Sequence, residues 1–122
     1  MKWMYGILGI LFAVPAASQT NPLIANDSIA QQEWVARAYE RLSPEARIGQ
    51  LFMVMAGSQP EGKEAEARRI GNLISKYQPG GIIFSRGTPQ TQIALTNAFQ
   101  KASEVPLLIA MDAEWGLAMR LD

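Results

Sequence analysis

The sequence of 122 residues contains no cysteine and no histidine. Without cysteine the chain forms no disulfide bond, and it lacks the thiol to which a lipoprotein anchor is attached. Without histidine the chain cannot supply a Ser–His–Asp triad. A G-x-S-x-G nucleophile elbow is also absent from the sequence. These absences exclude a disulfide scaffold and the usual serine-hydrolase arrangement.

Neither sign of charge is in excess. Eleven basic residues balance eleven acidic residues, so the formal net charge is zero. The sequence has no basic stripe of the kind that binds nucleic acid, and no acidic tail. We therefore expect no nucleic-acid partner.

The amino terminus has the layout of a secretory signal peptide. Lys2 precedes an apolar run over residues 4–14, and the small residues Ala16 and Ser18 follow it. The run is shorter than the ~20 residues that a membrane-spanning helix needs. We predict a signal peptide over residues 1–18, export to the periplasm or the extracellular space, and no stable membrane anchor.

After a polar leader, expected over residues 19–29, segments with apolar residues at helical spacing alternate with short, continuous apolar runs. Apolar residues three and four apart are typical of amphipathic helices, and continuous apolar runs are typical of buried strands. A capping hydroxyl followed by proline predicts a helix start at Ser43-Pro44 and at Thr88-Pro89. The expected elements are a helix with the stripe Val35, Ala38, Tyr39 and Leu42, a short helix from residue 44, a strand over 51–56, a helix over 61–78, a strand over 82–84, a helix over 88–103 and a strand over 105–112.

This order predicts an α/β fold. Apolar strands without alternation, separated by helices, imply a parallel sheet that is covered on both faces. A doubly wound sheet and a (β/α)8 barrel both fit the pattern. Glu64 and Arg68 stand four residues apart in the helix over 61–78, in the order that favours an ion pair, and we expect a solvated charged face there.

Two carboxylates follow the third strand, in the segment VPLLIAMDAEWG. Parallel α/β folds bind ligands at the carboxyl ends of strands, so Asp112 is a candidate for binding a hydroxyl group or a metal, or for acid–base chemistry. It equally fits the cap of a following helix. We expect Glu114 to be structural and Arg120 to pair with Glu114 or to hold a ligand. Trp115 fits a sugar-stacking platform, but we expect it to pack against its loop. Two carboxylates without histidine match a metal site poorly, so we predict none.

Three segments together resemble the start of the catalytic domain of glycoside hydrolase family 3. They are IGQLFMVMAG, KYQPGGIIFSRGTPQTQIALTNAFQKAS and VPLLIAMDAEWGLAMRLD. The resemblance covers residues 42–122 and is greatest to the bacterial β-N-acetylglucosaminidase branch. It implies that residues 30–122 form the first three βα units of a (β/α)8 barrel, incomplete in this chain, in an enzyme that hydrolyses β-linked sugars with retention and without a cofactor.

The resemblance also implies roles for residues. Asp112 matches the acid that accepts hydrogen bonds from hydroxyls of the bound sugar, and Arg120 matches a basic residue after it. The nucleophilic aspartate and the histidine acid/base of this branch lie on later segments, so the resemblance implies no catalytic residue in this chain. A β-glucosidase-type member, a truncated paralogue without catalysis and an unrelated doubly wound domain are the alternatives.

Three strands of a barrel leave two strand edges and an apolar sheet face uncovered, which invites aggregation. We therefore predict that the isolated chain of 122 residues is poorly soluble or only partly folded. Sedimentation and thermal denaturation followed by circular dichroism check this expectation. A cooperative thermal unfolding transition in a soluble monomer would contradict it.

Overall fold

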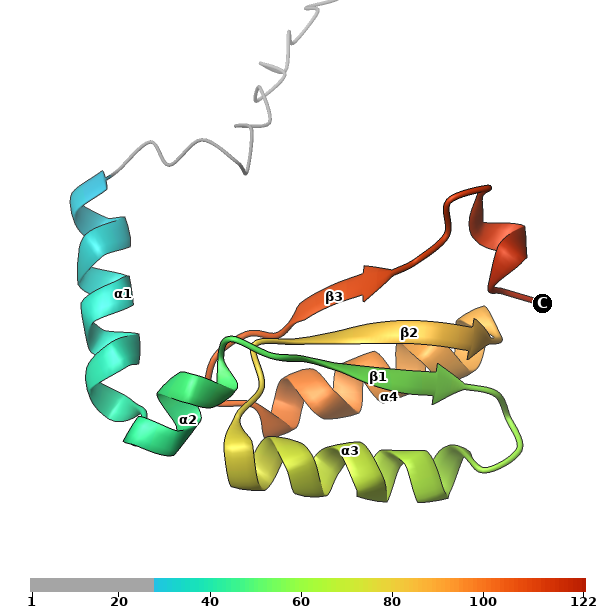
Figure 1. Ribbon diagram of the computed structural model, residues 1–122, viewed down its shortest axis with the longest axis horizontal. Helices are drawn as coiled ribbons and strands as arrows, with labels where there is room; N and C mark the ends of the chain where they lie inside the picture. The colour runs from blue at the N-terminus through green and yellow to red at the C-terminus, as the bar shows by residue number, and fades with distance from the viewer. Residues whose placement is uncertain (1–27) are drawn as a thin grey trace, which may run out of the picture.

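The computed structural model describes residues 28–122 (Figure 1). The predicted signal peptide, residues 1–18, lies outside the described residues, as does the predicted leader up to residue 27. The last two residues of that leader are helical, because the first helix begins at Ser28. Within residues 28–122, no helix is both long enough and apolar enough to cross a membrane.

The elements follow one another in the predicted order. Most of their ends differ from the predicted ends by a few residues, and a short 3-10 helix near residue 118 was not predicted. The elements are α1 (Ser28–Arg41), α2 (Pro44–Gly49), β1 (Met53–Ser58), α3 (Lys63–Tyr77), β2 (Gly81–Gly87), α4 (Pro89–Ala102), β3 (Leu108–Met111) and the 3-10 helix η1 (Leu117–Met119).

The two predicted caps are present at the helix starts. The Ala46 N–H donates to Ser43 Oγ at 3.2 Å, and the Thr91 N–H donates to Thr88 Oγ1 at 3.3 Å. Each hydroxyl satisfies an N–H that has no partner within its helix, and the proline that follows lacks such an N–H. The prediction of both helix starts is confirmed.

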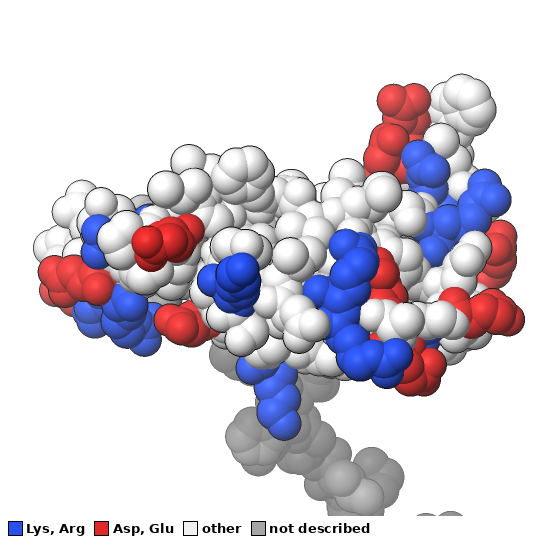
Figure 2. Space-filling model, turned by 60° about the horizontal axis from the view of Figure 1, so that its bottom comes forward, with Lys and Arg blue, Asp and Glu red and all other residues white. Residues whose placement is uncertain are grey.

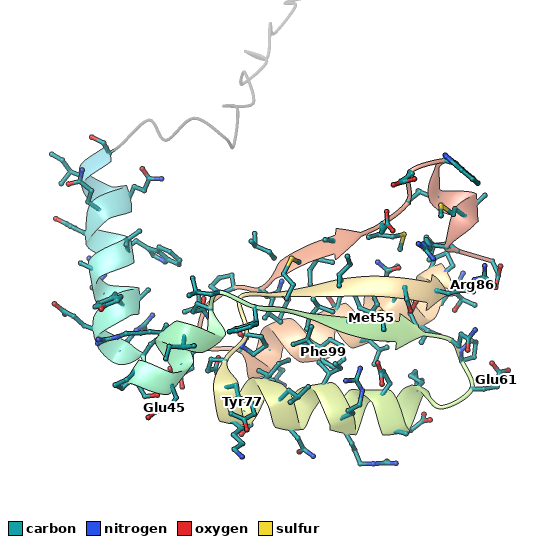
Figure 3. The ribbon with its side chains drawn as sticks, in the orientation of Figure 1. Glu45, Met55, Glu61, Tyr77, Arg86 and Phe99 are labelled. Atoms are coloured by element: carbon teal, nitrogen blue, oxygen red, sulfur yellow. The ribbon has the colours of Figure 1, made fainter. Side chains whose placement is uncertain are left out.

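The three strands form a parallel sheet in the order β1-β2-β3, and α3 and α4 cover the same face of it (Figure 1). Phe99 of α4 lies in the layer between the sheet and the helices (Figure 3). The buried core consists of Ala56, Ile70, Ile74, Ile82, Phe84, Leu95, Phe99 and Leu107. The prediction of an α/β fold with a parallel sheet is confirmed.

The opposite face of the sheet is open. The side chains of Met55 and Leu108 are 64% and 70% exposed, because no described helix covers this side. The prediction that the strands are buried on both faces is therefore wrong for residues 28–122. The uncovered apolar face that three strands were expected to leave is confirmed.

Helix α1 packs mainly through the end that joins α2. Ala38 and Leu42 of the predicted stripe are buried, whereas Val35 and Tyr39 are exposed. Arg47 of α2 stacks on the Tyr39 ring at 3.8 Å, and its Nε donates to the Tyr39 carbonyl oxygen at 2.9 Å. These contacts hold the carboxyl-terminal end of α1 against α2 and leave most of its apolar surface exposed.

A tight junction joins the loops at the amino ends of the strands. Gln78 is buried, and its side-chain oxygen accepts the Glu104 N–H at 2.9 Å. Gln50 Nε2 donates to the Gln78 carbonyl oxygen at 2.6 Å. The Gly80 N–H donates to the Phe52 carbonyl oxygen at 3.0 Å. A Cβ atom at position 80 would lie 2.1 Å from the Gln50 carbonyl oxygen, so only glycine fits there.

Gly80→Ala is expected to destabilise this junction by about 1–3 kcal/mol, the usual cost of overpacking. Gly71→Ala is the matched control, because nothing lies within 4 Å of a Cβ atom at that position in α3. Alanine within a helix gains about 0.5–1 kcal/mol over glycine. The rate of limited proteolysis in dilute solution should rise for Gly80→Ala and stay equal or fall for Gly71→Ala. Equal rates for the two variants would contradict the proposed junction.

Candidate functional site

Asp112 and Arg120 form an ion pair at the carboxyl end of β3. Asp112 directly follows the strand, and Arg120 directly follows η1. Arg120 Nε donates to the Asp112 carbonyl oxygen at 2.6 Å, and Arg120 Nη2 donates to Asp112 Oδ2 at 3.1 Å. The Asp112 side chain is 57% exposed and that of Arg120 is 25% exposed, so the carboxylate remains open to a ligand.

Arg120 is held in place by the end of β2. The Gly87 N–H donates to the Arg120 carbonyl oxygen at 3.0 Å, and the Asp122 N–H donates to the Gly87 carbonyl oxygen at 3.1 Å. Gly87 also forms a parallel bridge with Leu121. Its φ is +154°, and a Cβ atom there would lie 1.9 Å from the Ser58 carbonyl carbon. Because residue 87 is glycine, the end of β2 can pack closely against Ser58 of β1 and against residues 120–122 beside the site.

A small hollow of about 170 Å³ adjoins the ion pair. It combines an apolar floor with polar groups at one end, an arrangement common in ligand sites. An aliphatic ring with hydroxyl groups fits this combination, since carboxylate and guanidinium groups accept and donate hydrogen bonds respectively. The lining residues are Met55, Ile83, Phe84, Ser85, Asp112 and Arg120.

The structure corrects several expectations for the segment after β3. Gly116 precedes η1, so Asp112 does not cap the following helix. Arg120 pairs with Asp112 and not with Glu114, and no ion pair in the described part of the chain includes Glu114. Trp115 is 84% exposed, so the prediction that it packs against its loop is wrong. Its ring projects into solvent because no described residue covers this loop.

Gly87 is the site residue that sequence reasoning missed. Sequence analysis assigned Gly87 no role. Its position directly before Thr88, the cap of α4, was the available signal. The contacts of Gly87 with Arg120 and Asp122 form because the chain folds back toward β2 after η1, and no spacing in the sequence predicts this direction.

A larger hollow, of about 500 Å³, lies at the other end of β1, between α2 and α3. Its walls are almost entirely apolar, with Phe52, Leu73 and Tyr77 among them. It is lined by residues near the amino ends of the strands, and Met55 lines both hollows, but neither Asp112 nor Arg120 lines the larger one. We assign the candidate site to the smaller hollow, because charged groups meet there at the carboxyl ends of parallel strands.

Charged residues elsewhere are mixed in sign. Figure 2 shows Lys and Arg interspersed with Asp and Glu over the face that it presents, without an extended patch of one sign. Among residues 28–122, no three histidine, cysteine, aspartate or glutamate side chains are close enough to hold a metal ion.

Comparison with known proteins finds a similarity at the level of structure. No family model matches the chain, and no curated protein sequence matches it. Among solved structures, the chain is similar to a beta-glucoside phosphorylase, BglX, bound to 2FGlc, with a TM-score of 0.57 and 23% identity. The two chains share a fold. The match covers 71% of this chain and 17% of BglX, so this chain corresponds to a small part of that protein.

Proposed function

We propose that this chain is the amino-terminal part of the (β/α)8 catalytic barrel of an exported, retaining glycosidase of glycoside hydrolase family 3, and that it binds the sugar through Asp112 and Arg120. The proposed substrates are terminal β-N-acetylglucosaminides. The ion pair at the carboxyl end of β3, beside a hollow with an apolar floor, carries the proposal. The family resemblance over residues 42–122 and the fold shared with BglX support it.

The placement of the helices favours a barrel over a doubly wound sheet. In a doubly wound sheet helices cover both faces, whereas in a barrel they all lie outside and the inner face is filled by side chains from the strands. In the described residues, α3 and α4 lie on one face, and Met55 and Leu108 give the other face an apolar surface. The strand order also follows the chain order, as it does around a barrel.

In this proposal Asp112 and Arg120 orient the sugar. Arg120 Nη2 engages Asp112 Oδ2 at 3.1 Å, and a sugar hydroxyl donates to the other carboxylate oxygen. A second hydroxyl accepts from the guanidinium group. A retaining glycosidase also needs a carboxylate nucleophile and a general acid/base, and we propose that both come from segments outside these 122 residues.

A β-glucoside is the second candidate substrate, because the structure that shares the fold is named a beta-glucoside phosphorylase. The two candidate sugars differ at carbon 2, which carries an acetamido group in one and a hydroxyl in the other. A truncated paralogue that binds sugar without hydrolysing it is the third candidate. Turnover of aryl β-N-acetylglucosaminides and aryl β-glucosides by the complete enzyme distinguishes all three.

Asp112→Asn in the complete enzyme is expected to lower kcat/KM by about 10- to 100-fold, the range for losing a hydrogen bond to a charged group. Glu114→Gln is the control, because this neighbouring carboxylate forms no ion pair within residues 28–122 and should leave kcat/KM unchanged. Steady-state kinetics with the preferred aryl glycoside measure both effects. Equal kcat/KM for Asp112→Asn and Glu114→Gln would contradict a sugar-binding role for Asp112. If the parent enzyme turned over neither aryl β-N-acetylglucosaminides nor aryl β-glucosides, the proposed glycosidase activity would be contradicted.

A further inference from the structure

Ser85 places a hydroxyl group on the open face of the sheet, beside the candidate site. Phe84 is fully buried in the core under the helices, so the alternation of β2 turns Ser85 to the opposite face. There it follows Ile83 and lines the hollow beside Asp112 and Arg120. In a barrel this face is the interior, and ligands bind where the strands end at their carboxyl side. A second strand therefore brings a polar group to the proposed sugar site.

The strand register sets Ser85 beside Asp112. Phe84 of β2 pairs with Met111 of β3, and Ser85 and Asp112 are the next residues on the two strands. Neighbouring strands lie about 4.8 Å apart. Both side chains line the same hollow, so the hydroxyl and the carboxylate project side by side from neighbouring strands. One small polar group of a ligand can therefore contact both.

The hydroxyl of Ser85 is weakly held by the protein. Its Oγ donates to the Ala56 carbonyl oxygen at 3.4 Å, whereas hydrogen bonds between two oxygens are usually about 2.5–3.0 Å long. Gly57 lies beside Ser85 on β1, since the residues on either side of it pair with Phe84 and Gly87. A Cβ atom at position 57 would meet nothing within 4 Å, so β1 places no side chain over the hydroxyl. The Ser85 hydroxyl can thus turn toward a ligand at little cost in free energy.

A sugar hydroxyl complements the two side chains. An ionised carboxylate only accepts hydrogen bonds, so a hydroxyl that donates to Asp112 still needs a donor for its own lone pairs. Arg120 donates to the carbonyl oxygen and to one carboxylate oxygen of Asp112, and the proposed function assigns its remaining donor capacity to a second sugar hydroxyl. Ser85 supplies a donor for the first hydroxyl.

We propose that Ser85 is a substrate-binding residue, which donates a hydrogen bond to the same sugar hydroxyl that donates to Asp112. That hydroxyl is then bound from two strands, as an acceptor from β2 and as a donor to the residue that follows β3. Binding through both its oxygen and its hydrogen fixes the orientation of the hydroxyl and selects sugars that carry it. The inference rests on the proposed glycosidase function, because it adds a contact to the Asp112 site.

Ser85→Ala in the full-length glycosidase is expected to lower kcat/KM about 2- to 12-fold, the range for losing one hydrogen bond between neutral groups. Ser58→Ala is the matched control. Ser58 is the last residue of β1, and its Oγ also donates to a main-chain oxygen at 3.4 Å, that of Arg86. Unlike Ser85, it is fully buried and does not line the hollow. The control should leave kcat/KM unchanged.

Substrates that lack single hydroxyl groups provide the second measurement. We would measure kcat/KM of the parent, Ser85→Ala and Asp112→Asn with aryl glycosides deoxygenated at carbon 3, at carbon 4 or at carbon 6. One of these substrates should abolish the loss caused by Ser85→Ala and most of the loss caused by Asp112→Asn, because it lacks the hydroxyl that both side chains bind.

The outcomes separate this inference from the proposed function. Losses for Ser85→Ala and Asp112→Asn that disappear with the same deoxygenated substrate support the shared contact. Equal kcat/KM for Ser85→Ala and Ser58→Ala overturns it, as does a Ser85→Ala loss that persists with the substrate that abolishes the Asp112→Asn loss. In both cases, turnover by the parent and the Asp112→Asn loss leave the proposed function intact. A parent enzyme that turned over none of the aryl glycosides would overturn the proposed function and this inference together.

Discussion

Parallel pairing of β2 with β1 on one side and β3 on the other is the constraint on which the rest of the structure depends. It aligns Ala56, Phe84 and Met111 in one row and so forms a single apolar surface for α3 and α4. It also brings the carboxyl ends of the strands to one edge of the sheet. Asp112 lies at that edge because it directly follows β3.

Glycine at both ends of the central strand makes this pairing possible. Before β2, Gly80 donates its N–H to the Phe52 carbonyl oxygen at 3.0 Å and accepts the Leu108 N–H at 2.9 Å, so it joins the starts of all three strands. At the other end, Gly87 packs against Ser58 and binds the main chain of Arg120. The same strand therefore fixes the loop junction at one end and the candidate site at the other.

The order of the elements could be predicted from the sequence because it depends on local patterns. The Ser43 and Thr88 caps, the helical stripes and the apolar strand runs all act over a few residues. Asp112 could be singled out because parallel strands place function at their carboxyl ends. The resemblance to family 3 then suggested Arg120 as a second member of the site.

The remaining features depend on contacts between distant segments. Apolar strand runs predict two buried faces, but the open face of β1 and β3 follows from where the helices lie. Arg120 pairs with Asp112 and not with Glu114, because the chain after η1 folds back and binds the main chain of Gly87. Likewise, Glu66 pairs with Arg69 at 2.7 Å, and the predicted pair of Glu64 with Arg68 is not formed. Both paired side chains also bind the main chain of β1, which helical spacing alone does not predict.

A crystal structure of the proposed full-length glycosidase with bound N-acetylglucosamine or glucose tests the central claim most directly. The account predicts a sugar hydroxyl about 2.6–3.2 Å from a carboxylate oxygen of Asp112, with the ring over the hollow floored by Met55 and Ile83. It also predicts that Arg120 keeps its contact with the Asp112 carbonyl oxygen. A sugar bound without contact to Asp112, for example in the apolar hollow between α2 and α3, would contradict the account.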